Sequence, residues 1–199
     1  MGVVLIAYAS DHGQTKKISE RIASVLREFG HEVRLLDVRE SRGDFAFPEG
    51  GSGPDAILVG GSIRMGKHQR ELIEFTGLRR AALQRLPNAF YSVSLSASHA
   101  TPAAIREVKK TMARFIADTS WTPQRMISVA GALVYSEYGF FIRQMLRLIS
   151  WMAGGDTDTS RDYEYTDWAA VEAFAREFAG GIPLAASPGQ PRPRPQARA

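Results

Sequence analysis

The sequence predicts a doubly wound α/β fold, in which parallel strands alternate with helices along the chain. Short apolar runs without alternation recur through the sequence, which is typical of strands buried on both faces of a parallel sheet. Between them lie stretches whose apolar residues recur at helical spacing. Three of the runs end in turns of small polar residues, and such sheets bind ligands at turns beyond the carboxyl ends of their strands. Together these observations favour a parallel sheet covered by helices on both faces.

Five strands are expected, over residues 3–8, 31–38, 55–60, 88–95 and 126–131. The first and third are buried apolar runs, whereas the second alternates at its start and is expected nearer an edge of the sheet. Residues 41–54 hold four glycines and two prolines, so we interpret them as a loop.

Helices are expected between the strands. The first follows Thr15 and ends at Gly30, with an apolar stripe of Ile18, Ile22, Val25, Leu26 and Phe29. A second contains Leu72, Ile73, Leu83 and Leu86, and Gly77 is expected to interrupt it. The third starts at Thr101-Pro102, a cap followed by proline, and has an apolar stripe of Ile105, Val108, Met112, Phe115 and Ile116. The last begins near Asp167 and buries Val171, Phe174 and Phe178.

Length and composition indicate one globular domain, expected over residues 1–181, followed by a disordered tail over 182–199 that is rich in proline. The absence of cysteine excludes disulfides, cysteine-ligated iron–sulfur clusters and thiol catalysis. Neither a signal peptide nor an apolar stretch long enough to span a membrane is apparent. The net charge of +4 falls to about +1 without the arginines of the tail, so we expect no nucleic-acid partner.

The first strand runs directly into the turn Ser10–Thr15, which is the strongest local signal. Free N–H groups and the helix dipole favour an anion at this helix N-terminus, and Gly13 allows the backbone to approach a ligand closely. The turn contains no lysine or arginine, so neutral donors would hold a phosphate. An ordinary capped turn is the alternative, because small polar residues are common in turns.

Two further turns are expected at the same edge of the sheet. Residues 60–66 form a glycine-rich turn after the third strand, and residues 96–99 form a small polar turn after the fourth. In a doubly wound sheet such turns converge on one crevice. We therefore expect the first turn to bind a phosphate and the other two to flank the flat part of the same ligand.

The first turn, Ser10-Asp11-His12-Gly13-Gln14-Thr15, resembles the phosphate loop of flavodoxin-like proteins, Thr/Ser-x-Thr-Gly-Asn/Gln-Thr. His12 stands where that family has a hydroxyl residue. The resemblance implies a flavodoxin-like fold with strand order 2-1-3-4-5, counted along the chain, and FMN as the cofactor. A long insertion, residues 132–166, would lie between the fifth strand and the last helix.

More specifically, the chain resembles the family of menaquinone-dependent protoporphyrinogen oxidases within that superfamily. The resemblance covers residues 3 to about 178, and Met65 stands where the family more often has an aromatic residue. The stretches that carry the resemblance are residues 11–15, 61–66, 89–93, 130–133, 154–159 and 165–168. It implies FMN-dependent oxidation of protoporphyrinogen IX to protoporphyrin IX in haem biosynthesis, with menaquinone or another quinone as acceptor.

The resemblance and the expected turns together indicate a set of cofactor-binding residues. They are Ser10, Asp11, His12, Gly13, Gln14, Thr15, Ser62, Ile63, Arg64, Met65, Gly66, Ser94, Leu95, Ser96, Ala97, Gly131 and Ala132. Arg64 is the candidate catalytic residue: it would stabilise negative charge on reduced flavin or bind a propionate of the substrate, unless it is a solvated loop arginine. His12 and His99 lie in ligand-side turns, as proton-transfer groups or as ordinary turn residues. No metal site is expected.

The insertion contains a strongly apolar segment, residues 139–153, with Arg143 and Arg147 in a narrow polar stripe. A cationic stripe between aromatic flanks suits a membrane interface, and it also suits a quinone groove, a contact in a homo-oligomer or a helix packed on the core. We expect a cytoplasmic protein held peripherally on the inner face of the cell membrane. The alternatives to the oxidase are a flavodoxin-type electron carrier and a quinone reductase fed by a nicotinamide.

Overall fold

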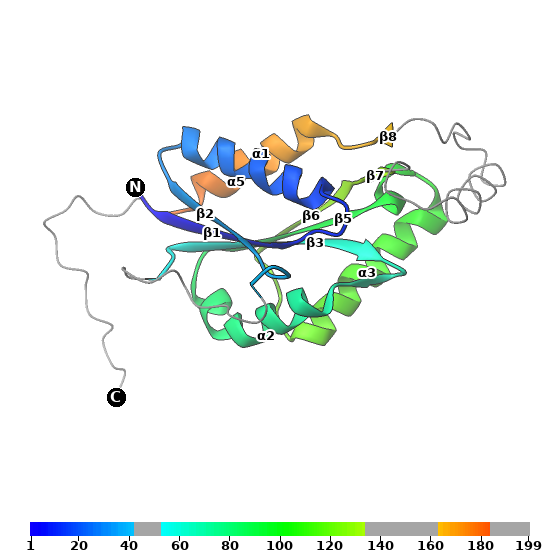
Figure 1. Ribbon diagram of the computed structural model, residues 1–199, viewed down its shortest axis with the longest axis horizontal. Helices are drawn as coiled ribbons and strands as arrows, with labels where there is room; N and C mark the ends of the chain where they lie inside the picture. Colours follow the sequence, from blue (N-terminus) through cyan, green and yellow to red (C-terminus); the bar gives the residue numbers. More distant parts are fainter. Residues whose placement is uncertain (42–52, 134–162, 184–199) are drawn as a thin grey trace, which may run out of the picture.

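The computed structural model describes residues 1–41, 53–133 and 163–183 and contains the predicted doubly wound sheet (Figure 1). The parallel strands lie in the order β2-β1-β3-β5-β6. Their bounds are β1 Val3–Ala9, β2 Glu32–Asp37, β3 Ala56–Arg64, β5 Asn88–Ser94 and β6 Arg125–Ala130. Because the short strand β4 is antiparallel, this order is the predicted 2-1-3-4-5 of the parallel strands, and β2 lies at an edge as expected.

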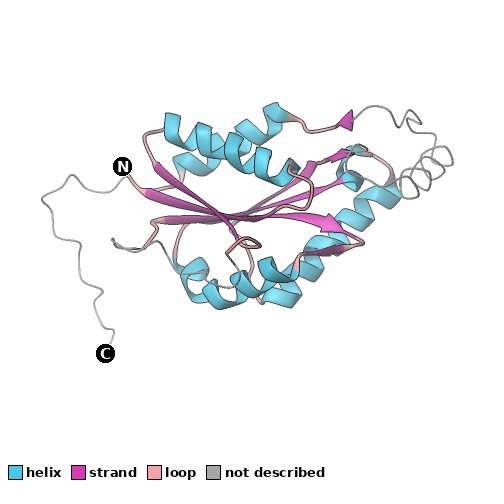
Figure 2. Cartoon of the chain, viewed as in Figure 1, coloured by secondary structure: helices cyan, strands magenta, loops and turns pink. Residues whose placement is uncertain are grey.

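Helices cover both faces of the sheet (Figures 1 and 2). Helices α1 (Gln14–Glu28) and α5 (Trp168–Gly180) lie on one face, and α2 (Arg70–Arg85) and α3 (Pro102–Thr119) lie on the other. Each pair packs on its own apolar cluster, one around Ile18, Ile22 and Phe174 and the other around Phe75 and Phe115. The central strands are therefore buried on both faces, which explains why β1 is an uninterrupted apolar run.

Two predicted boundaries are wrong. Helix α2 continues through Gly77, because the loss of about 1 kcal/mol for a helical glycine is smaller than the gain from burying Leu72, Phe75 and Leu83 on one side. Strand β3 also continues beyond Gly60 to Arg64. The expected turn at 60–66 is instead a hairpin: Met65 and Gly66 connect β3 to β4 (Lys67–His68), which pairs with it.

Gly60 leaves room for the ring of Tyr91 to pack directly against the backbone of β3. A Cβ at this position would lie 1.9 Å from the ring of Tyr91 on β5. The Tyr91 ring is fully buried and packs in the same cluster as α1. Glycine is thus required in β3 by the size of the neighbouring tyrosine.

The ends of the predicted insertion are joined by a short antiparallel pair, β7 (Ala132–Leu133) and β8 (Tyr163–Glu164). The apolar segment at 139–153 lies outside the described residues. Asp167 caps α5 by accepting a 3.0 Å hydrogen bond from the N–H of Ala170, as expected for a start near that residue. Ile182, assigned to the tail from the sequence, is buried in the core, whereas residues 184–199 lie outside the described residues.

Candidate functional site

The turns after β1, β3 and β5 line one cavity of about 120 Å³ at the carboxyl edge of the sheet. Twelve of the predicted cofactor-binding residues line it: Ser10, Asp11, His12, Gln14, Thr15, Ser62, Ile63, Arg64, Ser94, Leu95, Gly131 and Ala132. Val93, at the end of β5, lines it as well and was not predicted. We call this space the flavin cavity.

The remaining predicted residues lie around this cavity. Met65, Gly66 and Ser96 line an adjoining space of about 180 Å³, which shares Ile63, Ser94 and Leu95 with the flavin cavity. Gly13 lies at the exposed start of α1, and Ala97 lies in the 3₁₀ turn η1 (Leu95–Ser98). The N–H of Ala97 donates a 3.3 Å hydrogen bond to the hydroxyl of Ser94, which holds η1 against the end of β5.

The start of α1 has the features expected of an anion-binding site. Gly13 occupies the N-cap position with a φ of 77°, a left-handed conformation that favours glycine, and no side chain caps the helix. The buried hydroxyl oxygens of Ser10 and Thr15 have no hydrogen-bond partner among the described residues. Since a buried hydroxyl without a partner is unfavourable, these groups and the free N–H groups of the first turn fit a phosphate.

Buried hydrogen bonds link the backbone of Thr15 through Ser19 to Tyr91 on β5. The hydroxyl of Ser19 donates to the carbonyl of Thr15 at 2.7 Å, so its oxygen is left to accept from the hydroxyl of Tyr91 at 2.6 Å. Burial raises the pKa of Tyr91, which keeps the hydroxyl protonated as this donor. The first turn of α1 is therefore fixed to β5 before any ligand binds.

A polar network joins the first turn to the β3–β4 hairpin. The side-chain amide of Gln69 donates to a carboxylate oxygen of Asp11 at 3.0 Å and also to the hydroxyl of Ser62. The other carboxylate oxygen of Asp11 lies 2.7 Å from the guanidinium of Arg39, which also donates to the carbonyl of Ser10 at 2.8 Å. Arg39 thus offsets the repulsion that Asp11 would exert on a phosphate bound next to it.

Residues 165 and 166, just before α5, also support the residues that line the flavin cavity. The amide of Gln14 donates to the hydroxyl of Thr166 at 2.8 Å, and that hydroxyl donates to the carbonyl of Ala130 at 2.8 Å. The N–H of Tyr165 donates to the carbonyl of Gly131 at 3.1 Å. Residues 165–168 are among the stretches that carry the family resemblance, although they were not among the predicted site residues.

The histidines differ in their surroundings. His12 lines the flavin cavity, whereas His99 is exposed and lines none of the cavities described here. His68 on β4 is buried against Phe90 and Phe115, and burial lowers its pKa to about 4, so its ring is neutral near pH 7. Within the described residues no cluster of acidic or histidine side chains could hold a metal ion.

Fold and site together define a mononucleotide-binding protein of the doubly wound class. The model of the flavodoxin domain family matches residues 5–160, and the chain belongs to this family. FMN, the cofactor expected from the sequence, is the one that this membership indicates.

Two curated relatives extend over most of the chain. The protoporphyrinogen IX dehydrogenase [quinone] of Escherichia coli (strain K12) is 35% identical over 178 residues, which are 88% of this chain and 93% of that protein. The protein of the same name from Leishmania major is 32% identical over 195 residues, 92% of this chain and 77% of that protein.

Solved structures agree on the fold alone, because their sequence identities are low. An NADH:FMN oxidoreductase in its apo form superposes with a TM-score of 0.54 and 12% identity, over 92% of this chain and 91% of that one. Rubredoxin oxygen:oxidoreductase from Desulfovibrio gigas gives a TM-score of 0.53 and 14% identity over 92% of this chain. The present chain spans only 36% of that larger protein.

Proposed function

We propose that this protein oxidises protoporphyrinogen IX to protoporphyrin IX with bound FMN and passes the electrons to a quinone. The observation that carries the proposal is the match to the Escherichia coli dehydrogenase, since it covers 93% of that protein and not only a shared cofactor domain. The phosphate-binding turn and the adjacent cationic hairpin in this chain support it as well.

FMN, when bound, supplies a two-electron acceptor and donor, and the protein supplies binding and electrostatics. Ser10, Thr15 and the N–H groups of the first turn of α1 would hold the phosphate. Arg64, which borders the flavin cavity, would stabilise negative charge on the reduced ring or bind a propionate of the substrate. No described side chain is required as a covalent nucleophile, and we assign no general base.

The quinone is proposed to be menaquinone, reached from a membrane surface. Each helix in the described part of the chain is too short or too polar to span a bilayer. Residues 139–153 are the proposed contact, because their sequence combines a wide apolar face with Arg143 and Arg147, each worth about 1 kcal/mol near anionic lipid. We place the protein in the cytoplasm, bound peripherally to the inner face of the membrane.

This contact is tested with Arg143→Glu/Arg147→Glu, by sedimentation with anionic vesicles, flavin content and quinone reduction. We expect loss of vesicle binding and of quinone reduction with flavin retained. Loss of flavin with unchanged vesicle binding would assign the segment to the core of the fold. A change of oligomeric state in the variant would assign it to a contact between two copies.

The reaction is tested by anaerobic turnover of the purified FMN-loaded protein with protoporphyrinogen IX and, separately, NADPH, against menaquinone and ubiquinone analogues. The oxidation removes six electrons, so about three quinols should form per porphyrin if the flavin passes two electrons each time. Quinol formed with NADPH alone would indicate a nicotinamide-fed quinone reductase. Porphyrin that forms only after a separate reductase is added would indicate an electron carrier.

A further inference from the structure

The β3–β4 hairpin places two cations directly opposite each other. Arg64 and Lys67 are register partners across the antiparallel pair, and both are exposed. Like charges in such a pair repel, because their Cβ atoms are only about 5 Å apart. Neither has a hydrogen-bond or ion-pair partner in the part of the chain that the structure describes, so the pair is left uncompensated there.

The turn between these cations adds a second unfavourable feature. Met65 has a φ of 49° and Gly66 a φ of 72°, both in the left-handed region. A methionine in this conformation is strained, and its side chain is 94% exposed to solvent. Backbone strain and exposed apolar surface at one turn are typical of a place where a ligand binds.

Beside the hairpin lies a cleft of about 550 Å³, which we call the hairpin cleft. It is lined by Asp11, Arg39, Arg64, Met65, Lys67, His68, Gln69 and Glu71. Asp11 is already paired with Arg39, so Glu71 is the carboxylate of the cleft that has no ion-pair partner among the described residues. A further carboxylate, Glu107, lies at the turn outside the cleft, with Oε1 3.6 Å from the position of a Cβ at Gly66. The cleft shares Asp11 and Arg64 with the flavin cavity, so a ligand in the cleft would adjoin the cofactor.

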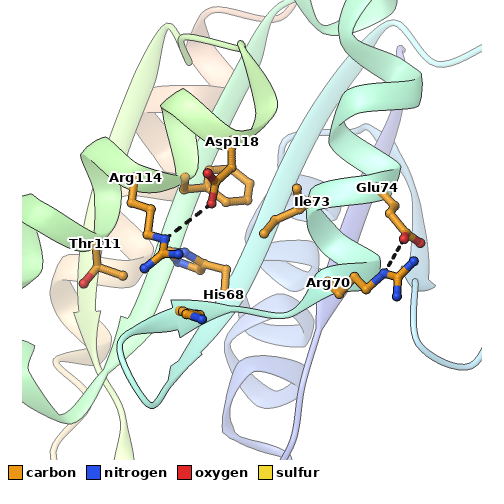
Figure 3. Close-up of a pocket in the computed structure, with 9 residues that line it drawn as sticks. His68, Arg70, Ile73, Glu74, Thr111, Arg114 and Asp118 are labelled. Carbon is orange, nitrogen blue, oxygen red and sulfur yellow. Dashed lines mark hydrogen bonds and ion pairs between the residues drawn. The ribbon is translucent and has the colours of Figure 1, made fainter.

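Lys67 also lines the cavity on the other side of β4, but the two arginines of that cavity are both paired with carboxylates. This cavity measures about 380 Å³ and lies between α2, α3 and β4 (Figure 3). Arg70 pairs with Glu74 at 2.6 Å, and Arg114 lies 3.6 Å from Asp118, as the dashed lines in Figure 3 mark. Its arginines are thus neutralised within their own helices, unlike the pair on the hairpin.

We propose that the hairpin cleft binds the carboxylates of the tetrapyrrole substrate, with Arg64 and Lys67 as the charged contacts and Met65 against the macrocycle. This inference rests on the function proposed above. An anion with a large apolar body suits the cation pair, the exposed Met65 and the cleft beside them. Its negative charge would offset the repulsion between Arg64 and Lys67, and its apolar part would cover the methionine. Arg64, on the border with the flavin cavity, would hold the carboxylate end next to the cofactor.

The test uses FMN-loaded protein and two fluorescent probes, protoporphyrin IX and its dimethyl ester, which lacks the carboxylate charges. Arg64→Gln/Lys67→Gln should weaken binding of the diacid by roughly 10-fold and leave the ester unchanged. Glu71→Gln should increase the affinity for the diacid, because it removes a negative charge from the cleft. The control Arg80→Gln/Arg85→Gln removes two cations from exposed positions of α2 and should change neither probe.

Equal losses for diacid and ester in the hairpin variant, or no loss for either, would overturn the proposal. An affinity for the diacid that does not increase in Glu71→Gln would overturn it too. Loss of binding to anionic phosphatidylglycerol vesicles with unchanged diacid affinity would assign the hairpin to lipid instead. These outcomes are distinct from failure of the proposed function, in which the wild-type protein forms no porphyrin anaerobically with a quinone.

Discussion

The Ser10–Thr15 turn and the β3–β4 hairpin lie at the same edge of the sheet, yet they present charge in opposite ways. The first offers neutral donors, with two buried hydroxyls that lack partners and an uncapped helix N-terminus. The second offers two exposed side-chain cations opposite each other at a strained turn. Asp11 and Gln69 connect the two regions by a hydrogen bond of 3.0 Å.

The two ligands that we propose for these regions, a resident cofactor and an exchanging substrate, need different binding groups. Backbone N–H groups and buried hydroxyls are already ordered, so binding costs little additional conformational entropy and retention is favoured. Long exposed side chains lose entropy on binding and are screened by salt, which favours release. The difference therefore supports the two proposals, FMN phosphate at the first turn and, at the hairpin, a ligand that leaves after each cycle.

The largest expected effect concerns the base of the hairpin. Burial lowers the pKa of His68 from 6.5 to about 4. Between these pH values the unfolded chain binds a proton at His68 that the folded chain does not. The contribution of the neutral His68 to the free energy of unfolding is therefore fully present above pH 6.5 and is lost as the pH falls towards 4. The contribution lost is about 3 kcal/mol in the free energy of unfolding.

Urea unfolding of the wild type and His68→Gln at pH 7 and pH 4.5 measures this effect. The variant should show a smaller loss of stability over this interval, while the exposed control His99→Gln should keep the wild-type dependence. Identical pH dependence in wild type and His68→Gln would mean that the neutral histidine does not stabilise the hairpin base.

The next effect concerns the first turn. Thr15→Val keeps the shape of the side chain but removes one hydroxyl that is free to bind phosphate. FMN affinity, measured by quenching of flavin fluorescence, should fall roughly 5- to 150-fold. The exposed Thr122→Val is the matched control and should bind as the wild type does. Unchanged affinity in Thr15→Val would remove this hydroxyl from the cofactor site.

The smallest expected effect is the salt dependence of ligand affinity, which should differ between the two regions. Raising NaCl from about 0.05 to about 0.5 M should weaken protoporphyrin IX binding by roughly 5-fold, because exposed charges are screened. FMN binding should change less, since neutral and buried donors hold its phosphate. Fluorescence titrations with both ligands at the two salt concentrations check this, and a larger change for FMN than for the porphyrin would reverse the assignment.

Much of the fold follows from apolar spacing. Of the predicted α1 stripe, Ile18, Ile22, Val25 and Leu26 are buried as expected, because a 3.6-residue period leaves only one way to face a sheet. Phe29, the last residue of the predicted stripe, is 45% exposed, because it lies at the C-cap beyond the last turn of the helix. Helix α2 was expected to break at Gly77, since local propensity does not include the burial of Leu72 and Phe75. The hairpin was also missed, because glycines in sequence indicate a turn without revealing the strand that returns.

The first turn of the site was predictable, since Ser10 and Thr15 are close in sequence and flank a strand-to-helix transition. Arg39, Lys67 and Gln69 were not predicted. Gln69 reaches Asp11 across 58 positions of sequence, and Arg39 reaches Ser10 across 29. Only the parallel sheet brings these side chains together, so no local pattern could have identified them.

The most direct test of the account compares FMN with riboflavin, which lacks the phosphate. Apo-protein titrated with each flavin should bind FMN roughly 100-fold more tightly, because the free N–H groups of α1 and the hydroxyls of Ser10 and Thr15 gain their partner only in FMN. Thr15→Val should narrow that ratio by weakening FMN alone. Equal affinities for the two flavins in the wild type would contradict the assignment of this turn to the phosphate.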